Sequence, residues 1–321
     1  GRGGEGFVAV TPEARKKFWL DRSRTAAIAA HTNAFKVNED VVIPLGRLGE
    51  YSDGIERINI ELSIKNKLAL LDALEDFLKG DLPLFEDDDG VADPDLTEAR
   101  RERALAMLVE VRGRWQGYLD DLDAPLPPSL CKISDHAPQS EGKSVFRALQ
   151  DHSLRVSWKR EVRAELRQIF TGREYEPVLA ECDAIHRRVL KGRVFVALHM
   201  HAGDGNVHTN IPVNSDDYAM LQAANAAVVR IMALATDLGG VISGEHGIGL
   251  TKLEFLDDAA MAIFADYKQK VDPNQRFNKG KLLPGADLRN AYTPSFSLLE
   301  AESIILEASE TEAIADSIKD C

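Results

Sequence analysis

The stretch Arg193-Val-Phe-Val-Ala-Leu-His-Met-His-Ala-Gly-Asp-Gly-Asn-Val-His-Thr-Asn-Ile-Pro-Val213 decides the fold that we expect for this chain. Its ends, Arg193–Leu198 and Thr209–Val213, favour β-strands because Val, Ile and Phe suit a pleated, half-buried surface. Asp204-Gly205 lies between them and favours a two-residue type I′ turn, in which both central residues need a positive φ. The sequence therefore predicts a β-hairpin.

Histidines gather on one face of this predicted hairpin. The register set by the turn places His201 opposite His208 and His199 opposite Asn210, and alternation brings all four to the same face. Directly opposed Cβ atoms lie about 4.5–5.5 Å apart, so two such imidazoles can share one metal ion. With three of the chain's 8 histidines placed in this way, a metal site is favoured over a hairpin whose histidines are merely hydrogen-bonded.

A second glycine-rich segment, Ser243-Gly-Glu-His-Gly-Ile-Gly249, can supply a further ligand, because its glycines permit a close approach of the backbone. Glu245 and His246 are neighbours, so in an extended loop their side chains point in different directions. We expect one to bind the metal and the other to face a substrate. The alternative for Glu245 is a cap on the following helix, since acidic residues are common near helix N-termini. The loop alone leaves both open.

Composition excludes several classes of protein. The 321 residues are 44% apolar and 28% charged, as in globular domains, and can form one large domain or two modest ones. The net charge of -13 argues against nucleic acid as a partner, because phosphate binding needs clustered Lys and Arg. No uninterrupted apolar run reaches the length of about 18 residues expected of a transmembrane segment. The 3 scattered cysteines favour a reducing compartment over a disulfide framework.

Residues 65–189 differ from their flanks, because charged helical patterns alternate with acidic or proline-containing breaks. We expect a helical insertion here, including one helical stretch over Lys143–Phe170. The flanks, 1–64 and 190–290, should form a substrate- and metal-binding domain. In the first flank Thr11-Pro12 should begin a helix and Val41–Pro44 a short strand. The expected class is α+β, an antiparallel sheet covered by helices, with a large helical insertion.

The two glycine-rich motifs together resemble the paired signature of the FAD-linked oxidase C-terminal domain. That family includes D-lactate dehydrogenases, the glycolate oxidase flavin subunit and D-2-hydroxyglutarate dehydrogenase. Phe18–Arg22, Glu39–Pro44 and Asp272–Lys281 also look like family landmarks in the expected order. The resemblance covers roughly 11–60 and 190–285 and leaves the insertion unexplained. It implies the cap-domain fold of the vanillyl-alcohol-oxidase type of flavoenzyme.

The resemblance also implies a metal centre and a general base. His201, His208 and Glu245 would hold a divalent metal, for which Zn is expected, and His246 would be the general base. His199 is a departure from the family pattern, because it stands where an apolar or aromatic residue is expected, and it could compete as a ligand.

Further residues are implied to bind substrate and cofactor. Arg22 would pair with the substrate carboxylate, and Asn210 would hydrogen-bond the substrate. Lys36 would supply a second cation, although Asn38 aligns better with that place. Asn278 would lie on the flavin side, in a run Asn278-Lys-Gly-Lys281 where the family has Asn-Pro-Gly-Lys.

The activity that the resemblance implies is FAD-dependent oxidation of a D-2-hydroxy acid, such as D-lactate, to the 2-oxo acid by hydride transfer to the flavin. Most of the FAD would be held by a domain of the same polypeptide that is absent here, so this chain alone should be inactive. The expected location is the cytoplasm, or the periphery of the inner face of the membrane.

Both ends of the chain read as cuts through a longer polypeptide. Residues 291–321 should form a C-terminal helix that leads to an absent downstream module. Some relatives carry an iron–sulfur module at this place, and Cys321 would then be the first ligand of its cluster.

Two other functions remain open on the residues alone. Two histidines and a glutamate with an open coordination position also serve zinc hydrolases, although no His-Glu-x-x-His helix is present. The chain could instead be a non-catalytic, metal-stabilised assembly domain whose acidic helical insertion carries the function.

Overall fold

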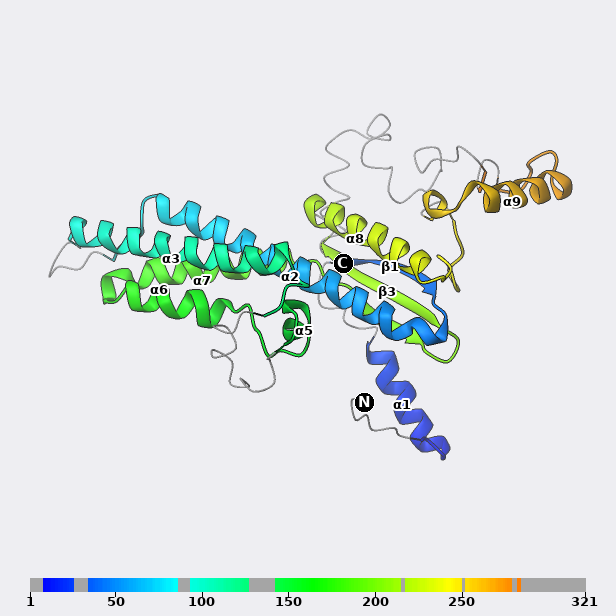
Figure 1. Ribbon diagram of the computed structural model, residues 1–321, viewed down its shortest axis with the longest axis horizontal. Coiled ribbons are helices and arrows are strands. Elements are labelled where there is room, and N and C mark those ends of the chain that lie inside the picture. The colour runs from blue at the N-terminus through cyan, green and yellow to red at the C-terminus, as the bar shows by residue number, and fades with distance from the viewer. Residues whose placement is uncertain are drawn as a thin grey trace, which may run out of the picture. The chain divides into compact units, whose positions relative to one another are not determined.

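The computed structural model describes residues 8–25, 34–85, 93–126, 142–214, 217–249, 252–278 and 282–283. The chain forms an α+β fold with two compact units (Figure 1). The sheet unit comprises Gly1–Leu48, Leu198–Asp216 and Val228–Cys321, and the helical unit comprises Gly49–Ala197 and Asp217–Ala227. The domain boundary expected at 64/65 falls inside a single long helix. The assignment of these parts to a substrate domain and an insertion stays a prediction, and 291–321 lies outside the described residues.

The sheet unit is built on an antiparallel sheet whose strand order is β1-β3-β2. β1 (Ala34–Val42) pairs with β3 (Asn206–Asn214) along its whole length, and β2 (Ala197–His201) flanks β3 on the other side. Paired residues share a face, so alternation gives this sheet an apolar face and a polar face. The apolar face carries the buried residues Val41, Val207, Ile211 and Val213. The polar face carries Asn38, Asp40, Asn206, His208 and Asn210.

The hairpin forms as predicted, but its turn is longer than the expected pair Asp204-Gly205. β2 ends at His201 and β3 begins at Asn206, so the turn spans residues 202–205. Gly205 has a φ of 80°, and its carbonyl accepts the N–H of Ile43 at 2.9 Å. A Cβ on Gly205 would lie 2.1 Å from the Ile43 oxygen. The longer turn is thus in contact with Ile43, the residue after β1. Turn preferences of the local sequence cannot predict such a contact.

Two predicted strands have different bounds. β1 begins at Ala34 and ends at Val42, before the predicted stretch Val41–Pro44 is complete. The strand predicted from Arg193 is wrong over 193–196, because β2 begins only at Ala197. The amide side chain of Asn59 takes the place of a strand partner there: it donates to the Val196 oxygen at 2.9 Å and accepts the Val196 N–H at 2.7 Å.

Helices complete the sheet unit. α1 (Pro12–Thr25) begins as predicted, with the Thr11 hydroxyl accepting the N–H of Ala14 at 3.1 Å. α8 (Tyr218–Asp237) starts in the helical unit and ends in the sheet unit, and η6 (Leu253–Phe255) and α9 (Asp258–Val271) follow it. Among the described helices α8 alone has the length and apolarity of a membrane span, at 20 residues and a mean hydropathy of 1.4. Core helices meet the same criterion, and Ile231 and Ala235 of α8 are fully buried.

The helical unit has its own apolar core, formed around Leu71, Leu74, Leu108, Trp115 and Val162. η2 (Leu45–Arg47) belongs to the sheet unit and directly precedes α2 in the chain. The elements of the helical unit are α2 (Leu48–Lys79), α3 (Pro94–Asp120), α5 (Val145–Gln150), η4 (Trp158–Arg163), α6 (Ala164–Ile169), η5 (Arg173–Tyr175) and α7 (Glu176–Lys191).

The single helical stretch predicted over Lys143–Phe170 is broken into α5, η4 and α6. His152 adopts a φ of 64°, which ends the first piece. The Ser157 hydroxyl then caps the second piece by accepting the N–H of Arg160 at 3.3 Å. Side-chain caps of this kind compete with a continuous helix.

The reactivity of the buried Cys182 thiol in α7 can be used to test the packing of the helical unit. Burial raises the pKa of this thiol to about 12 from 9.0, with the nearby Asp183 and Glu181 adding to the effect. Because the pKa of the thiol is raised in the folded chain, its contribution to the free energy of unfolding is complete below pH 9.0. This contribution is lost as the pH rises toward about 12. In a variant with Cys131→Ser and Cys321→Ser, we expect no maleimide labelling of the folded chain at pH 8 and complete labelling in guanidinium chloride. Labelling of the folded chain at the rate of a free thiol would contradict this packing.

Candidate metal centre

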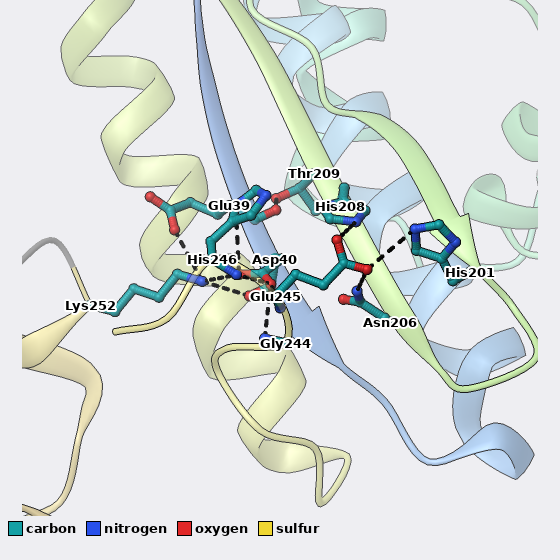
Figure 2. A network of polar contacts seen from close by, with 10 residues as sticks. All are labelled: Glu39, Asp40, His201, Asn206, His208, Thr209, Gly244, Glu245, His246 and Lys252. Carbon is teal, nitrogen blue, oxygen red and sulfur yellow. Dashed lines mark hydrogen bonds and ion pairs between the residues drawn. The ribbon is translucent and has the colours of Figure 1, made fainter. Parts of the chain in front are cut away.

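The structure brings His201, His208 and Glu245 together. One ligand atom from each lies within 4.8 Å of the other two. The Glu245 carboxylate lies 3.4 Å from His201 Nε2 through Oε1 and 3.6 Å from His208 Nε2 through Oε2 (Figure 2). Bonds of about 2.0–2.1 Å at tetrahedral angles would put two ligands of one Zn²⁺ roughly 3.3 Å apart. The spacing therefore fits a single ion held by two imidazoles and one carboxylate.

The environment of His208 also suits a metal ligand. Its residue is 8% exposed, and burial is the main cause that lowers the pKa of its imidazole. Glu245 and Asp40 act in the opposite direction, while His246 and His201 add to the lowering. A lowered pKa keeps the ring neutral at physiological pH, and the neutral imidazole is the form that binds a metal.

Asn206 fixes the carboxylate of Glu245 but was not singled out by the sequence analysis. The residue is 5% exposed, and its Nδ2 donates to Glu245 Oε1 at 2.9 Å. Its position at the start of β3 places it beside the loop that carries Glu245. A buried amide that orients a ligating carboxylate is the usual partner in metal sites. The sequence signal was present, since Asn206 follows the turn directly, on the same strand face as His208.

Asp40 lies in the landmark Glu39–Pro44, but the sequence did not predict a role for it. It is fully buried on β1, opposite His208. Its carboxylate accepts the N–H groups of Gly244 and His246 at 2.9 Å each and that of Glu245, and it also binds Lys252. Burial would raise the pKa of Asp40, but these hydrogen bonds and the Lys252 charge outweigh it and lower the pKa to about 2. An acid directly before the predicted strand Val41–Pro44 was the available signal, since a buried charge needs partners.

His246 and His199 lie beside the ligand cluster. The His246 ring is 5.0 Å from the His208 ring, and its Nδ1 lies 3.8 Å from Asp40 Oδ1. The His199 ring lies 6.1 Å from the rings of both His201 and His208, and His199 is not part of the group whose ligand atoms converge. The structure thus gives His201 and His208, rather than His199, the geometry of ligands.

The residues predicted to bind substrate and flavin lie on different elements of the structure. Asn210 lies opposite Asn38 on the polar face of the sheet, and the side-chain oxygens of both are buried without a partner among the described residues. Arg22 belongs to α1, and Lys36 belongs to β1, opposite Pro212. Asn278 has a φ of 45°, and its carbonyl accepts a hydrogen bond from the Lys268 ammonium at 2.8 Å. The roles of Arg22, Lys36, Asn210 and Asn278 stay predictions.

A substitution at Gly244 can test the geometry of the centre. A Cβ at this position would lie 2.4 Å from Asn206 Oδ1 and 3.1 Å from Asp40 Oδ2. We expect Gly244→Ala to push the loop away from the sheet and to weaken Zn²⁺ binding by at least tenfold, as for other changes in the outer shell of a metal site. Calorimetric titration with Zn²⁺ measures this effect.

The matched control is Gly203→Ala in the hairpin turn, where a Cβ would meet nothing within 4 Å. This variant should bind Zn²⁺ as the unchanged chain does. Equal affinities of the Gly244 and Gly203 variants would show that the contact at Gly244 is unimportant for the centre.

Part of the chain is similar to known proteins. Residues 175–282 match the family model described as FAD linked oxidases, C-terminal domain. The chain is 38% identical over 87 residues to the D-lactate dehydrogenase of Anaerostipes hadrus, covering 26% of this chain and 18% of that protein. It is 36% identical over 94 residues to the glycolate oxidase subunit GlcD of Escherichia coli K12, covering 28% of this chain and 19% of that protein. The cytochrome D-lactate dehydrogenase of Arabidopsis thaliana mitochondria is 33% identical over 88 residues, covering 26% and 16%.

These alignments span less than a fifth of each of the three relatives. The family match includes α7, which the sequence analysis assigned to the insertion, and the whole β2–β3 hairpin. It also includes the loop with Glu245 and His246, so both motifs that suggested the family lie inside it. Residues 175–282 are therefore similar to the C-terminal domain of the FAD linked oxidases.

Proposed function

We propose that this chain is the substrate- and metal-binding part of an FAD-dependent dehydrogenase that oxidises a D-2-hydroxy acid, D-lactate or a close relative, to the 2-oxo acid. The observation that carries the proposal is the convergence of His201, His208 and Glu245 inside the segment that matches the FAD linked oxidases. Similar proteins are named for D-lactate and for glycolate, which are both 2-hydroxy acids.

The chemistry follows from the arrangement of the donors. When bound, a divalent ion at the two histidines and Glu245 would polarise the substrate hydroxyl, and the flavin would accept the hydride. His246 lies beside this cluster and is suited to take the hydroxyl proton, because imidazole transfers protons near neutral pH. Arg22 and Lys36 would pair with the substrate carboxylate. The side-chain oxygen of Asn210, which has no partner among the described residues, would accept a hydrogen bond from the substrate.

The remaining parts of the enzyme belong to the same proposal. The sheet unit would be a cap domain of the vanillyl-alcohol-oxidase type, and a further domain of the polypeptide would hold most of the FAD, with Asn278 on the flavin side. The iron–sulfur module stays a prediction, because Cys321 lies outside the described residues. Zn as the native metal and a cytoplasmic or membrane-peripheral location also stay predictions.

The family match supports the flavoenzyme over the two other functions left open by the residues. A zinc hydrolase and a metal-stabilised assembly domain would need the same ligands, but neither would account for a sequence shared with FAD linked oxidases.

The metal site is tested first by removing its histidines. His201→Ala combined with His208→Ala leaves Glu245 as the only member of the cluster, so we expect stoichiometric Zn²⁺ binding to be lost in calorimetry and elemental analysis. The control is His152→Asn in the helical unit, since Asn tolerates the positive φ of this exposed position. Unchanged Zn²⁺ affinity in the double variant would refute the assignment.

The proton-transfer role is tested in the chain joined to its FAD-binding part. His246→Ala should lower kcat for D-lactate-dependent dye reduction by roughly 10²–10⁴, the usual range for a lost general base. Metal content should stay the same, because Glu245 keeps its place. If metal content falls while kcat is unchanged, His246 and Glu245 have the opposite roles.

A further inference from the structure

We propose that Asp40 is the positioning residue of the metal centre: its carboxylate holds the backbone of residues 244–246 so that Glu245 turns to the two histidines and His246 lies beside them. The inference rests on the proposed function in so far as the cluster binds a metal. It concerns a residue whose role neither the motifs nor the family match assigns.

The first argument is the convergence of backbone N–H groups on one oxygen. Asp40 Oδ2 accepts the N–H of Gly244 at 2.9 Å, that of His246 at 2.9 Å and that of Glu245 between them. Successive N–H groups that point at one acceptor form an anion-binding concavity. In this chain the anion is a side chain 204 residues from Gly244 in sequence, so a strand of the sheet fixes the curvature of the loop.

The second argument is that the carboxylate itself cannot turn. Lys252 is 1% exposed, and its ammonium donates to Asp40 Oδ1 at 2.5 Å and to the Asp40 carbonyl at 2.7 Å. The Glu39 carboxylate lies 3.4 Å from the same ammonium. The lysine thus engages one carboxylate oxygen and leaves the other for the loop. Lys252 follows the loop in the chain. Asp40 therefore binds residues both within the loop and after it.

The third argument is that the loop has little else to hold it. Glu245 and His246 are exposed residues, and the described part of the chain provides no other acceptor for the N–H groups of residues 244–246. Before the loop, the backbone is hydrogen-bonded to the end of β1 at the bridge between Val42 and Val241.

From the fixed backbone, Glu245 extends to His201, His208 and Asn206, as Figure 2 shows. Asp40 fixes the backbone of Glu245 and Asn206 fixes its carboxylate, so strands β1 and β3 together set the direction of this ligand. Asp40 also lies opposite His208. A displaced loop would therefore separate the carboxylate ligand from the imidazole ligands.

A test must separate the hydrogen-bond acceptor from the buried charge. Removing Asp40 alone would strand the buried Lys252 ammonium, and an unpaired buried charge destabilises a fold strongly. We therefore use two variants that both carry Lys252→Met. Asp40→Asn keeps an acceptor oxygen without the charge, and Asp40→Leu keeps the approximate shape without any acceptor.

Two measurements are made on each folded chain: amide hydrogen exchange at residues 244–246, and the affinity for Zn²⁺ by calorimetry. The asparagine variant should keep the protection of these amides and bind Zn²⁺ within a few-fold of the unchanged chain. In the leucine variant the amides should exchange as in an unstructured loop, and Zn²⁺ affinity should fall by about 10–100-fold. Rescue by asparagine identifies positioning, because a purely electrostatic role would be lost in both variants.

Equal amide protection in the asparagine and leucine variants would overturn the inference. If the leucine variant does not fold, the unchanged chain decides: its amides at 244–246 should exchange more slowly than those of Gly247 and Gly249, and equal rates would overturn the inference. Failure of the proposed function gives a different result, in which the folded, unchanged chain binds no Zn²⁺ although the amides keep their Asp40-dependent protection.

Discussion

The antiparallel pairing of β1 with β3 is the constraint on which the candidate centre depends. It places Asp40 opposite His208 and Asn38 opposite Asn210, so residues from distant parts of the sequence share one face of the sheet. The opposite face is apolar and includes Val41, Val207 and Ile211. A slip of one residue would turn the polar side chains into the apolar core. Burial of that face therefore also specifies the register of the polar face.

The polar face combines buried charges with the groups that compensate them. Asp40 and Lys252 are almost completely buried, and they are tolerated because each finds the other and because backbone N–H groups complete the shell of the carboxylate. Burial also lowers the pKa of the His208 imidazole. The centre thus contains a fixed ion pair beside this imidazole, and the acid of the ligand group, Glu245, is exposed.

Short motifs and alternation along strands were sufficient to predict the hairpin, the α+β class and the place of His201 and His208 on it. The choice of Glu245 as the third member of the cluster came from the family resemblance, because the loop alone left its role open. The sequence could not predict hydrogen bonds between residues that lie far apart in the chain. The predicted turn was shorter than the observed one, in which Gly205 is hydrogen-bonded to Ile43, and the predicted strand began before Ala197, where Asn59 is hydrogen-bonded to Val196. The role of Asp40 could not be predicted for the same reason: its partners are the N–H groups of residues 244–246 and the Lys252 ammonium, which lie 204–212 residues away in sequence.

The position of the helical unit within the chain has a consequence for folding. Most of it, Gly49–Ala197, lies between the strands that must pair, so β1 cannot find β3 until that whole segment has been synthesised. Contacts this distant in sequence form slowly, because the entropy of closing the loop is lost before any contact compensates for it. The helices have a separate apolar core made of nearer neighbours and can fold first, which brings the ends of the long loop closer together. Because His201, His208 and Glu245 all follow Gly49–Ala197 in the chain, we expect the helices of this segment to form before the metal ligands come together.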